Sequence, residues 1–169
     1  LSVYKISEKN SFKIKNSVYK IEDLVNTENI TEFKNGYALI FRLCVDDYHR
    51  YHFFDDGWKE EDHYIPGIFH TVNPVANDYY PIYKTNSRSY SLLHTSHFDD
   101  VVMMEVGAMM VGKITNHPVT TFKRGDEKGY FLFGGSTVVL LFKENVVEID
   151  KDIIKNSRLG LETRVKLGE

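Results

Sequence analysis

The chain has 169 residues, of which 42% are hydrophobic and 14% aromatic. This composition predicts one globular domain, because the chain is too short for two full cores and too apolar to be disordered. Its 21 basic and 24 acidic residues give a net charge of −3, which excludes the basic field that binds nucleic-acid phosphates. We therefore expect no nucleic-acid partner. No apolar run is long enough to span a bilayer, and the single Cys44 excludes an intrachain disulfide.

Short strand-like runs separated by turn residues follow one another along the chain. Alternating polar and apolar residues predict strands at 11–15 and 17–21, and a short helix opens at 21–24. After the Asn35-Gly36 turn, the run 37–45 is dense in β-formers. Further strands are expected at 67–72, 89–93, 101–106, 111–114, 131–133, 137–142 and 146–149. Turn residues recur at roughly 8–12-residue spacing, which predicts a single compact, mainly β domain, sandwich- or barrel-like, with one or two short helices.

Histidines are concentrated in the first part of the chain. Six of the seven fall between positions 49 and 97, and two pairs have i,i+3 spacing: His49 with His52, and His94 with His97. Imidazoles bind zinc or transfer protons near neutral pH. The alternative is a set of exposed or hydrogen-bonded histidines, including His70, without a role. No ligand spacing matches a closed zinc site, so we predict no metal site.

Two adjacent glycines precede a serine between two strand-like runs, in Gly134-Gly135-Ser136-Thr137. Glycines in this position are typical of a bulge or tight bend. The alternative uses the backbone freedom that they provide. The Ser136 hydroxyl would then attack the carbonyl of Gly135, replace the amide by an ester and cut the chain by elimination, leaving a ketone at the new N-terminus. There is no Gly-x-Ser-x-Gly, so this is not a lipase-type nucleophile.

A run rich in arginine and histidine, residues 41–52, follows a predicted strand. Side chains of this kind pair with a carboxylate or a phosphate. A solvated strand edge is the equally supported alternative.

Together these features resemble the phosphatidylserine decarboxylase family of pyruvoyl enzymes. The resemblance extends over residues 1–169 in order and rough spacing. It is carried by Asp47-Tyr48-His49-Arg50-Tyr51-His52, Pro66-Gly67-Ile68-Phe69-His70-Thr71-Val72-Asn73-Pro74, Asn86-Ser87-Arg88, Val106-Gly107-Ala108-Met109-Met110-Val111-Gly112 and Lys128-Gly129-Tyr130-Phe131-Leu132-Phe133-Gly134-Gly135-Ser136-Thr137.

The resemblance implies a proenzyme that cuts itself between Gly135 and Ser136. Residues 1–135 would form the β subunit, and residues 136–169 the α subunit, with Ser136 converted into a pyruvoyl cofactor. The position of His52 matches the family's self-cleavage base, and His49 matches the histidine of the decarboxylation step. The pyruvoyl ketone condenses with an amine substrate and acts as an electron sink for the loss of CO2. The implied reaction converts phosphatidylserine to phosphatidylethanolamine; a soluble amino acid as substrate, or a histidine-based metal-binding domain without this activity, are the alternatives.

Two departures from the family pattern affect what is expected. The aspartate of the family's cleavage triad lies upstream of Leu1, so we expect self-cleavage to be slow or absent in this chain. Ser87 stands where many relatives carry glutamate. The N-terminal portion of the family is missing, and we expect a fragment that is soluble by itself. The intact protein is expected at the cytoplasmic face of the cell membrane as a peripheral enzyme. A homodimer, formed by pairing of strand edges, is a further expectation.

Overall fold

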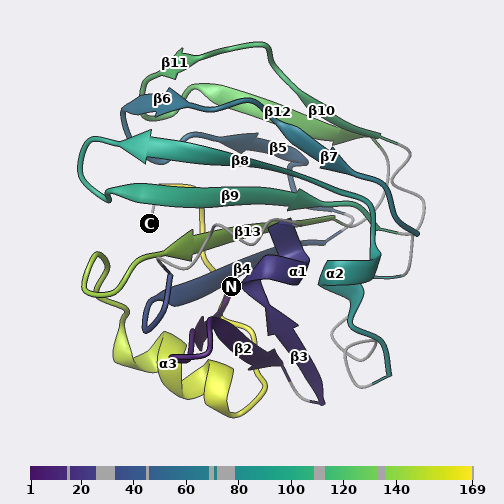
Figure 1. Ribbon diagram of the computed structural model, residues 1–169, viewed down its shortest axis with the longest axis vertical. Helices are drawn as coiled ribbons and strands as arrows, with labels where there is room; N and C mark the ends of the chain where they lie inside the picture. Colours follow the sequence, from purple (N-terminus) through teal and green to yellow (C-terminus); the bar gives the residue numbers. More distant parts are fainter. Residues whose placement is uncertain are drawn as a thin grey trace.

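The computed structural model describes residues 1–14, 16–25, 33–44, 46–68, 71, 79–108, 113–132 and 136–168, and residue 136 by its backbone alone. Antiparallel strands dominate this part of the chain, which confirms the mainly β class (Figure 1). The core is one continuous apolar cluster that all sheets share.

A large sheet of eight antiparallel strands forms the centre of the molecule. Its middle strands are largely buried, and β13 and β9 are mostly apolar. The strands, in sheet order, are β1 (Ser2–Lys5), β4 (Tyr37–Leu43), β13 (Ser136–Phe142), β9 (Asp100–Val106), β8 (Arg88–Thr95), β6 (Gly57–Lys59) and β11 (Thr121–Phe122), with β7 (His63–Ile65) also paired to β8.

A small sheet covers part of one face of the large sheet. It consists of β10 (Lys113–Asn116), β12 (Glu127–Leu132) and β5 (Arg50–His52) in that order. Aromatic rings join the two layers: Phe53, directly after β5, stacks on Phe122 of β11 with ring centroids 3.8 Å apart. A hairpin of β2 (Ser11–Ile14) and β3 (Ser17–Lys20) completes the strands, as the alternating pattern predicts.

Three short helices occur in the described residues, one more than expected. The helix predicted at 21–24 is α1 (Ile21–Val25), which buries Ile21, Leu24 and Val25. Helix α2 (Ile82–Thr85) and helix α3 (Lys151–Arg158) were not predicted. Helix α3 packs on β1, where the Ser157 hydroxyl accepts a hydrogen bond from the Val3 amide at 2.9 Å. Figure 1 shows α3 and the hairpin at the bottom of the view and the small sheet at the top.

Two strand predictions need correction. Residues 146–149 form no strand, because β13 already pairs with β4 on one side and β9 on the other. Their apolar side chains instead pack against the core on the way to α3. In the predicted strand at 67–72, Ile68 makes a single parallel bridge to Asn86, while most of the remaining positions lie outside the described residues.

The register of the large sheet brings four strand ends together. Ser136, at the start of β13, pairs with Leu43 at the end of β4, and Thr137 pairs with Val106 at the end of β9. Val106 in turn pairs with Arg88 at the start of β8. We call this edge, defined by Leu43, Ser136, Val106 and Arg88, the loop end of the large sheet. It carries the connections that lead to the small sheet and to α2.

Candidate active site

Two chain connections join strands that are paired with one another at the loop end. One leads from β4 to β5 through His49, and the other leads from β12 to β13 and ends at Ser136. Their strands are paired at both ends: Leu43 lies opposite Ser136, and the Phe131 amide donates a hydrogen bond to the His49 carbonyl at 2.9 Å. The backbone pairing therefore brings the predicted histidine and serine segments to one place, although almost ninety positions separate them in the sequence.

The His49 ring is held in one tautomer by its own turn. Nδ1 lies 2.7 Å from the carbonyl oxygen of Asp47. A carbonyl only accepts hydrogen bonds, so Nδ1 carries the proton and Nε2 carries the lone pair. The turn is closed by two further bonds: the Cys44 amide donates to the Asp47 carboxylate at 2.7 Å, and the Asp47 amide donates to the Cys44 carbonyl at 3.0 Å.

The free nitrogen of His49 is buried. Within the described part of the chain, Nε2 has no hydrogen-bond partner. A buried acceptor without a partner costs about 1–3 kcal/mol, and a substrate group that forms a hydrogen bond with Nε2 would recover that cost. His49 thus has the properties of a group that accepts and returns a proton.

His52 lies at the end of β5, opposite Glu127. The Tyr48 ring lies nearly parallel to its imidazole, with centroids 6.2 Å apart. Its Nδ1 is also buried and has no partner in the ranges that the structure describes. Asp55 and Asp56, the nearest aspartates after it in sequence, are used elsewhere: Asp55 accepts from the ring and amide of His97, both at 2.8 Å, and Asp56 accepts from the Arg124 amide. No carboxylate among the described side chains forms a hydrogen bond or an ion pair with His52.

Of the other histidines, His117 lies near this place, because its Nε2 bonds Glu127 at 2.7 Å and Glu127 lies opposite His52; the remaining described histidines do not. At the opposite end of β8, His94 lies between the carboxylates of Asp100 (2.6 Å) and Glu60 (3.2 Å) and stacks on Trp58. His63 stacks on Tyr90, and His70 lies outside the described residues. Where the chain is described, no three His, Cys, Asp or Glu side chains are close enough to hold a metal ion. The described residues therefore offer no set of ligands for the alternative of a metal-binding domain.

The arginines of the 41–52 run pair with carboxylates of the same chain. Arg42 binds Glu162 through Nε at 2.8 and 3.0 Å, and this hydrogen bonding lowers the pKa of the Glu162 carboxyl below its usual value. Arg50 binds both oxygens of Glu127 at 2.7 and 2.8 Å. Both arginines are thus occupied by carboxylates of the chain itself, and Arg50, 46% exposed, lies on a solvated strand edge.

A buried ion pair lies between the small sheet and the large sheet, with Lys128 on β12 and Glu105 on β9. Lys128 Nζ contacts Glu105 Oε1 at 2.8 Å and Asp62 Oδ1 at 3.0 Å, and the side chains of Lys128 and Glu105 are both fully buried. Burial raises the pKa of Glu105, against the opposing effect of the Lys128 ammonium. Burial also acts to raise the pKa of Asp62, but Lys128 and Lys59 bring it below its usual value.

A β-bulge aims Lys128 into this interior. Glu127 lies opposite His52 and Gly129 opposite Tyr51, so Lys128 is the extra residue on β12. Gly129 has to be glycine, since a Cβ there would lie 2.2 Å from the Thr115 carbonyl and 2.7 Å from the Tyr51 hydroxyl.

Hydrogen bonds extend the ion pair to β5. The Tyr51 hydroxyl donates to Asn116 Oδ1 at 2.8 Å. The amide of Asn116 donates in turn to Ser89 at 3.1 Å and to Glu105 at 3.3 Å. The sequence patterns described above do not predict this network. One signal for it is present, however: Glu105 is a lone charge inside the apolar run 101–106, and such a charge needs a buried partner. The network connects β5, which carries His52, to the strands that border Ser136.

Asn86, Ser87 and Arg88 act as cross-links. Arg88 donates to the carbonyls of Asp23 (2.9 Å) and Leu24 (2.7 Å) at the end of α1. Asn86 donates to the Gly107 carbonyl at 2.7 Å. Ser87, the position that departs from the family pattern, bonds the Gly67 amide and carbonyl, both at 3.0 Å. This segment therefore fixes the loops at the loop end.

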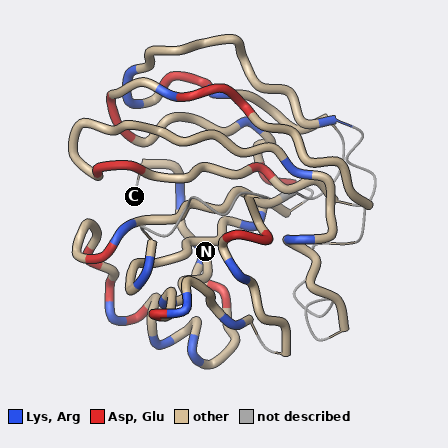
Figure 2. The backbone as a smooth tube through the Cα atoms, viewed as in Figure 1, with Lys and Arg blue, Asp and Glu red and all other residues tan. Residues whose placement is uncertain are grey.

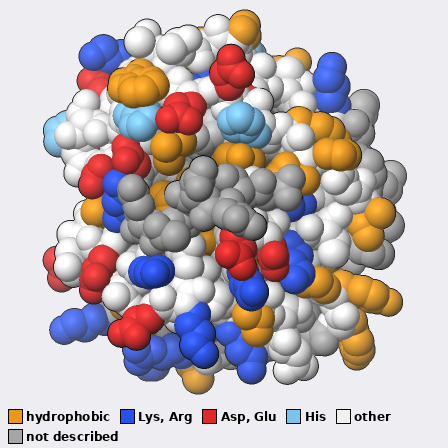
Figure 3. Space-filling view, viewed as in Figure 1, with side chains coloured by type: hydrophobic (Ala, Val, Ile, Leu, Met, Phe, Trp, Pro, Cys, Tyr) orange, Lys and Arg blue, Asp and Glu red, His pale blue; other side chains and the backbone are white. Residues whose placement is uncertain are grey.

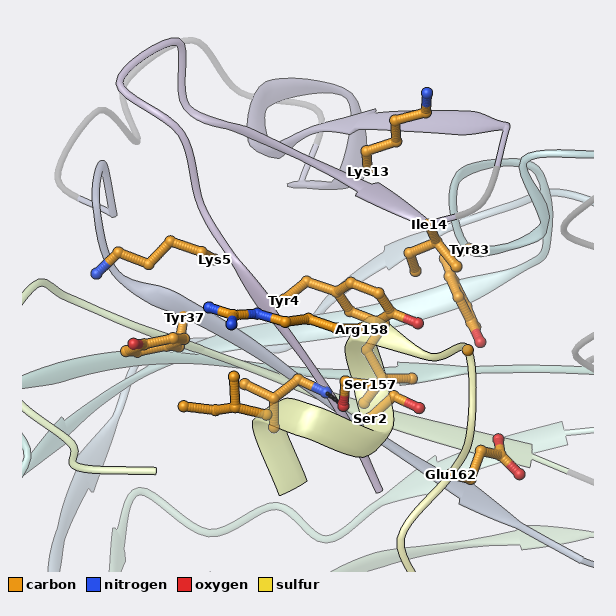
Figure 4. A pocket seen from close by; sticks show the side chains of 14 residues that line it. Ser2, Tyr4, Lys5, Lys13, Ile14, Tyr37, Tyr83, Ser157, Arg158 and Glu162 are labelled. Carbon is orange, nitrogen blue, oxygen red and sulfur yellow. Dashed lines mark hydrogen bonds between the residues drawn. The ribbon is translucent and has the colours of Figure 1, made fainter. Parts of the chain in front are cut away.

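A wide cleft of about 800 Å³ lies elsewhere, between β1, β2 and α3. Figure 4 shows Arg158 extending between Tyr4 and Tyr37, with Ile14 of β2 pointing toward them and Lys13 pointing away. The cleft contains neither histidine nor a nucleophile activated by one, so it lacks the proton-transfer groups that are present at the loop end.

The fold and the site define a class: a mainly β domain in which a histidine with a free, buried nitrogen is hydrogen-bonded through its backbone to β12, the strand that precedes Ser136 in the chain. Comparison with known proteins identifies the family. The sequence profile of the phosphatidylserine decarboxylase family matches residues 1–169, so the chain belongs to that family.

Curated relatives agree with this membership. The chain is 52% identical, over its whole length, to phosphatidylserine decarboxylase proenzyme 2 of Clostridium acetobutylicum, and it covers 58% of that protein. It is 45% identical to the phosphatidylserine decarboxylase proenzymes of Clostridium botulinum and Desulfitobacterium hafniense, with 93% of this chain matched and 55% and 54% of the relatives covered. The chain thus spans little more than half the length of these relatives.

Proposed function

We propose that this chain is the catalytic part of a pyruvoyl-dependent decarboxylase that converts phosphatidylserine to phosphatidylethanolamine. The observation that carries the proposal is the buried, unpartnered Nε2 of His49 at the loop end, where β13 begins with Ser136. The names of the relatives supply the reaction class and the word proenzyme.

In the proposed self-cleavage, the bond changes take place at residues of this chain, and the family's upstream aspartate orients His52. His52 takes the proton of the Ser136 hydroxyl as its oxygen attacks the Gly135 carbonyl. The C–N bond then breaks, the released nitrogen of residue 136 takes up this proton, and an ester between the two residues replaces the amide. His52 then takes the α-proton of residue 136, and the Gly135 carboxylate leaves by elimination. Addition of water to the dehydrated residue expels its nitrogen as ammonia and leaves the ketone of a pyruvoyl group. Gly135 itself lies outside the described residues, and the Ser136 side chain with it.

The site fits such a group, because the buried nitrogen of His49 has no partner within the described part of the chain. A pyruvoyl group, once formed at position 136, provides a carbonyl that condenses with the substrate amine and stores the electron pair left by CO2. His49 would first take up a proton at Nε2 from solvent and would then give it to the carbon that has lost CO2, while Nδ1–H stays anchored on the Asp47 carbonyl at 2.7 Å. General acid catalysis of this kind contributes about 10²–10⁴-fold, or about 3–5 kcal/mol.

The packing of residues 136–169 supports an assembly that survives the cut. Strand β13 lies between β4 and β9, and α3 packs on β1. Thr163 and Leu1 exchange two backbone hydrogen bonds, at 2.8 and 2.9 Å, and Glu162 binds Arg42. Both products would therefore stay in one fold, as the expected α and β subunits of residues 136–169 and 1–135.

Two preparations test the proposal. One is the chain as it stands, which lacks the family's upstream aspartate. The other carries, in front of Leu1, the N-terminal part of the Clostridium acetobutylicum relative. We expect the first to remain near 19.7 kDa in the mass spectrum and the second to split at 135–136 and release CO2 from phosphatidylserine. Full cleavage of the first would refute the role of the aspartate. CO2 release by the second from free aromatic amino acids, and none from phosphatidylserine, would favour the soluble-substrate alternative.

The remaining expectations concern partners and location. A homodimer and a peripheral position at the cytoplasmic face of the membrane stay predictions for the intact protein. No described helix combines the length and apolar character needed to cross a membrane. Light scattering of the extended protein at two concentrations, and fractionation of cells that express it, test these two predictions.

A further inference from the structure

Large apolar side chains are exposed around the loop end. We define the apolar rim as five residues with these exposed fractions: Tyr48 (62%), Ile68 (51%), Tyr79 (76%), Tyr80 (55%) and Leu132 (38%). A folded protein keeps exposed apolar side chains scattered unless the surface has a partner. Five of the eleven exposed large apolar side chains in the described residues lie toward this end, and their position beside the candidate site indicates an interaction surface.

The topology places each rim residue beside the candidate site. Tyr48 precedes His49 in the β4–β5 connection, and Leu132 is the last residue of β12, four positions before Ser136. Ile68 is bridged to Asn86, two positions before Arg88. Tyr79 and Tyr80 lead into α2, which ends at Asn86. Figure 3 shows hydrophobic side chains along the right-hand side, where Figure 1 places α2 and the end of β7.

We propose that the apolar rim inserts into the lipid bilayer that holds the substrate, an inference that rests on the proposed function. Phosphatidylserine has two acyl chains anchored in a membrane, so its headgroup reaches His49 only if the loop end faces the bilayer. A protein seated on the rim would block that approach, which favours the bilayer as occupant. Three of the five residues are tyrosines, whose apolar ring and polar hydroxyl suit the membrane interface.

Charge does not direct the chain to a membrane by another face. Figure 2 shows acidic and basic residues interspersed over the strands and helices, without a field of one sign. Leu159 and Leu161, after α3, are exposed to a similar degree as the rim residues. They lie away from the site and provide the matched control.

Fluorescence quenching tests the rim directly on this chain. Trp58 is the single tryptophan and pairs with His94, six positions along β8 from Arg88, which is about 20 Å from the loop end. With phosphatidylcholine–phosphatidylserine vesicles carrying brominated acyl chains, we expect unchanged Trp58 emission. In Trp58→Phe/Tyr79→Trp, most of the emission should be lost. Equal quenching of both proteins, or of neither, would overturn the proposal.

Vesicle flotation measures the contribution of the rim. Ile68→Ser/Tyr79→Ser should lower the fraction bound to the same vesicles, without bromine, about tenfold or more, as expected from the apolar area withdrawn from water. Leu159→Ser/Leu161→Ser should bind as the unmodified chain does. Equal losses in the two variants would contradict a membrane contact at the loop end.

Activity separates this proposal from the proposed function. In the N-terminally extended protein, Ile68→Ser/Tyr79→Ser should decarboxylate dissolved short-chain phosphatidylserine at the unmodified rate. Its rate on phosphatidylserine in vesicles should fall about tenfold. Unchanged rates on vesicles would refute the rim. If the unmodified protein acts on neither substrate, the proposed function fails, while quenching and flotation still decide whether the rim enters a bilayer.

Discussion

Replacing Lys128 by methionine should destabilise the protein strongly. The substitution leaves the Glu105 carboxylate fully buried without the ammonium at 2.8 Å, and Asp62 loses its contact at 3.0 Å. Removing one partner of a buried ion pair costs about 3–5 kcal/mol, a large part of the total of about 5–15 kcal/mol for a domain. With a urea m-value of about 1–3 kcal/mol/M, the midpoint of urea unfolding should fall by about 2 M.

The pH dependence identifies Glu105 as the cause. Burial already holds the pKa of Glu105 above its unfolded value, and the loss of Lys128 raises it further. A carboxyl with a higher pKa in the folded state takes up a proton on folding, so stability decreases as pH rises from about 4.3 toward the folded pKa. The deficit of Lys128→Met should therefore be smaller at pH 5 than at pH 8.

Two control variants accompany this experiment. Adding Glu105→Gln to Lys128→Met removes the uncompensated charge and should recover at least half of the loss. Lys123→Met, which removes the exposed ion pair with Asp56 at 3.0 Å, should leave the urea midpoint nearly unchanged. The reasoning is refuted if Lys128→Met costs no more than Lys123→Met, or if its deficit is independent of pH.

Three further predictions concern the site and its supports. In the N-terminally extended protein, His49→Ala should still cut at 135–136 but decarboxylate about 10²–10⁴-fold more slowly, whereas His52→Ala should remain uncut. Gel analysis measures the cut and CO2 release measures the decarboxylation. An uncut His49→Ala protein would contradict the assignment. Gly129→Ala, whose new Cβ meets the Thr115 carbonyl, should lower the free energy of unfolding by at least about 2 kcal/mol; a wild-type denaturation curve would show that the contact is not tight. Arg42 lowers the pKa of Glu162, so this pair stabilises the fold above the unfolded pKa of about 4.3, and the stabilisation is lost as pH falls through the folded pKa. Glu162→Gln should therefore lower the free energy of unfolding by up to about 1 kcal/mol at pH 7 and by little at pH 3. An equal cost at both pH values would oppose this explanation.

Local patterns predicted most of the strands. The hairpin of β2 and β3, helix α1 and the runs of β4, β8, β9 and β13 follow from alternation, turn residues and β-propensity, which are properties of neighbouring residues. The error at 146–149 has a different origin. These residues have strand-like composition, but the strand before them has no free edge to offer.

The candidate site depends on contacts between distant parts of the chain. His49 and Ser136 were chosen through the family resemblance, since the patterns alone left a bend and an unused histidine as alternatives. The free nitrogen of His49 depends on a turn that only the structure shows. The partner of Glu105 was likewise unpredictable, because it requires the bulge at Lys128 and the pairing of β12 with β5.

Mapping of a carbonyl-reactive hydrazine on the N-terminally extended protein tests the central claim most directly. The account predicts a single adduct, on the first residue of a fragment that comprises residues 136–169, and no adduct in Ser136→Ala. An intact serine at position 136 in an uncut, folded protein would contradict it.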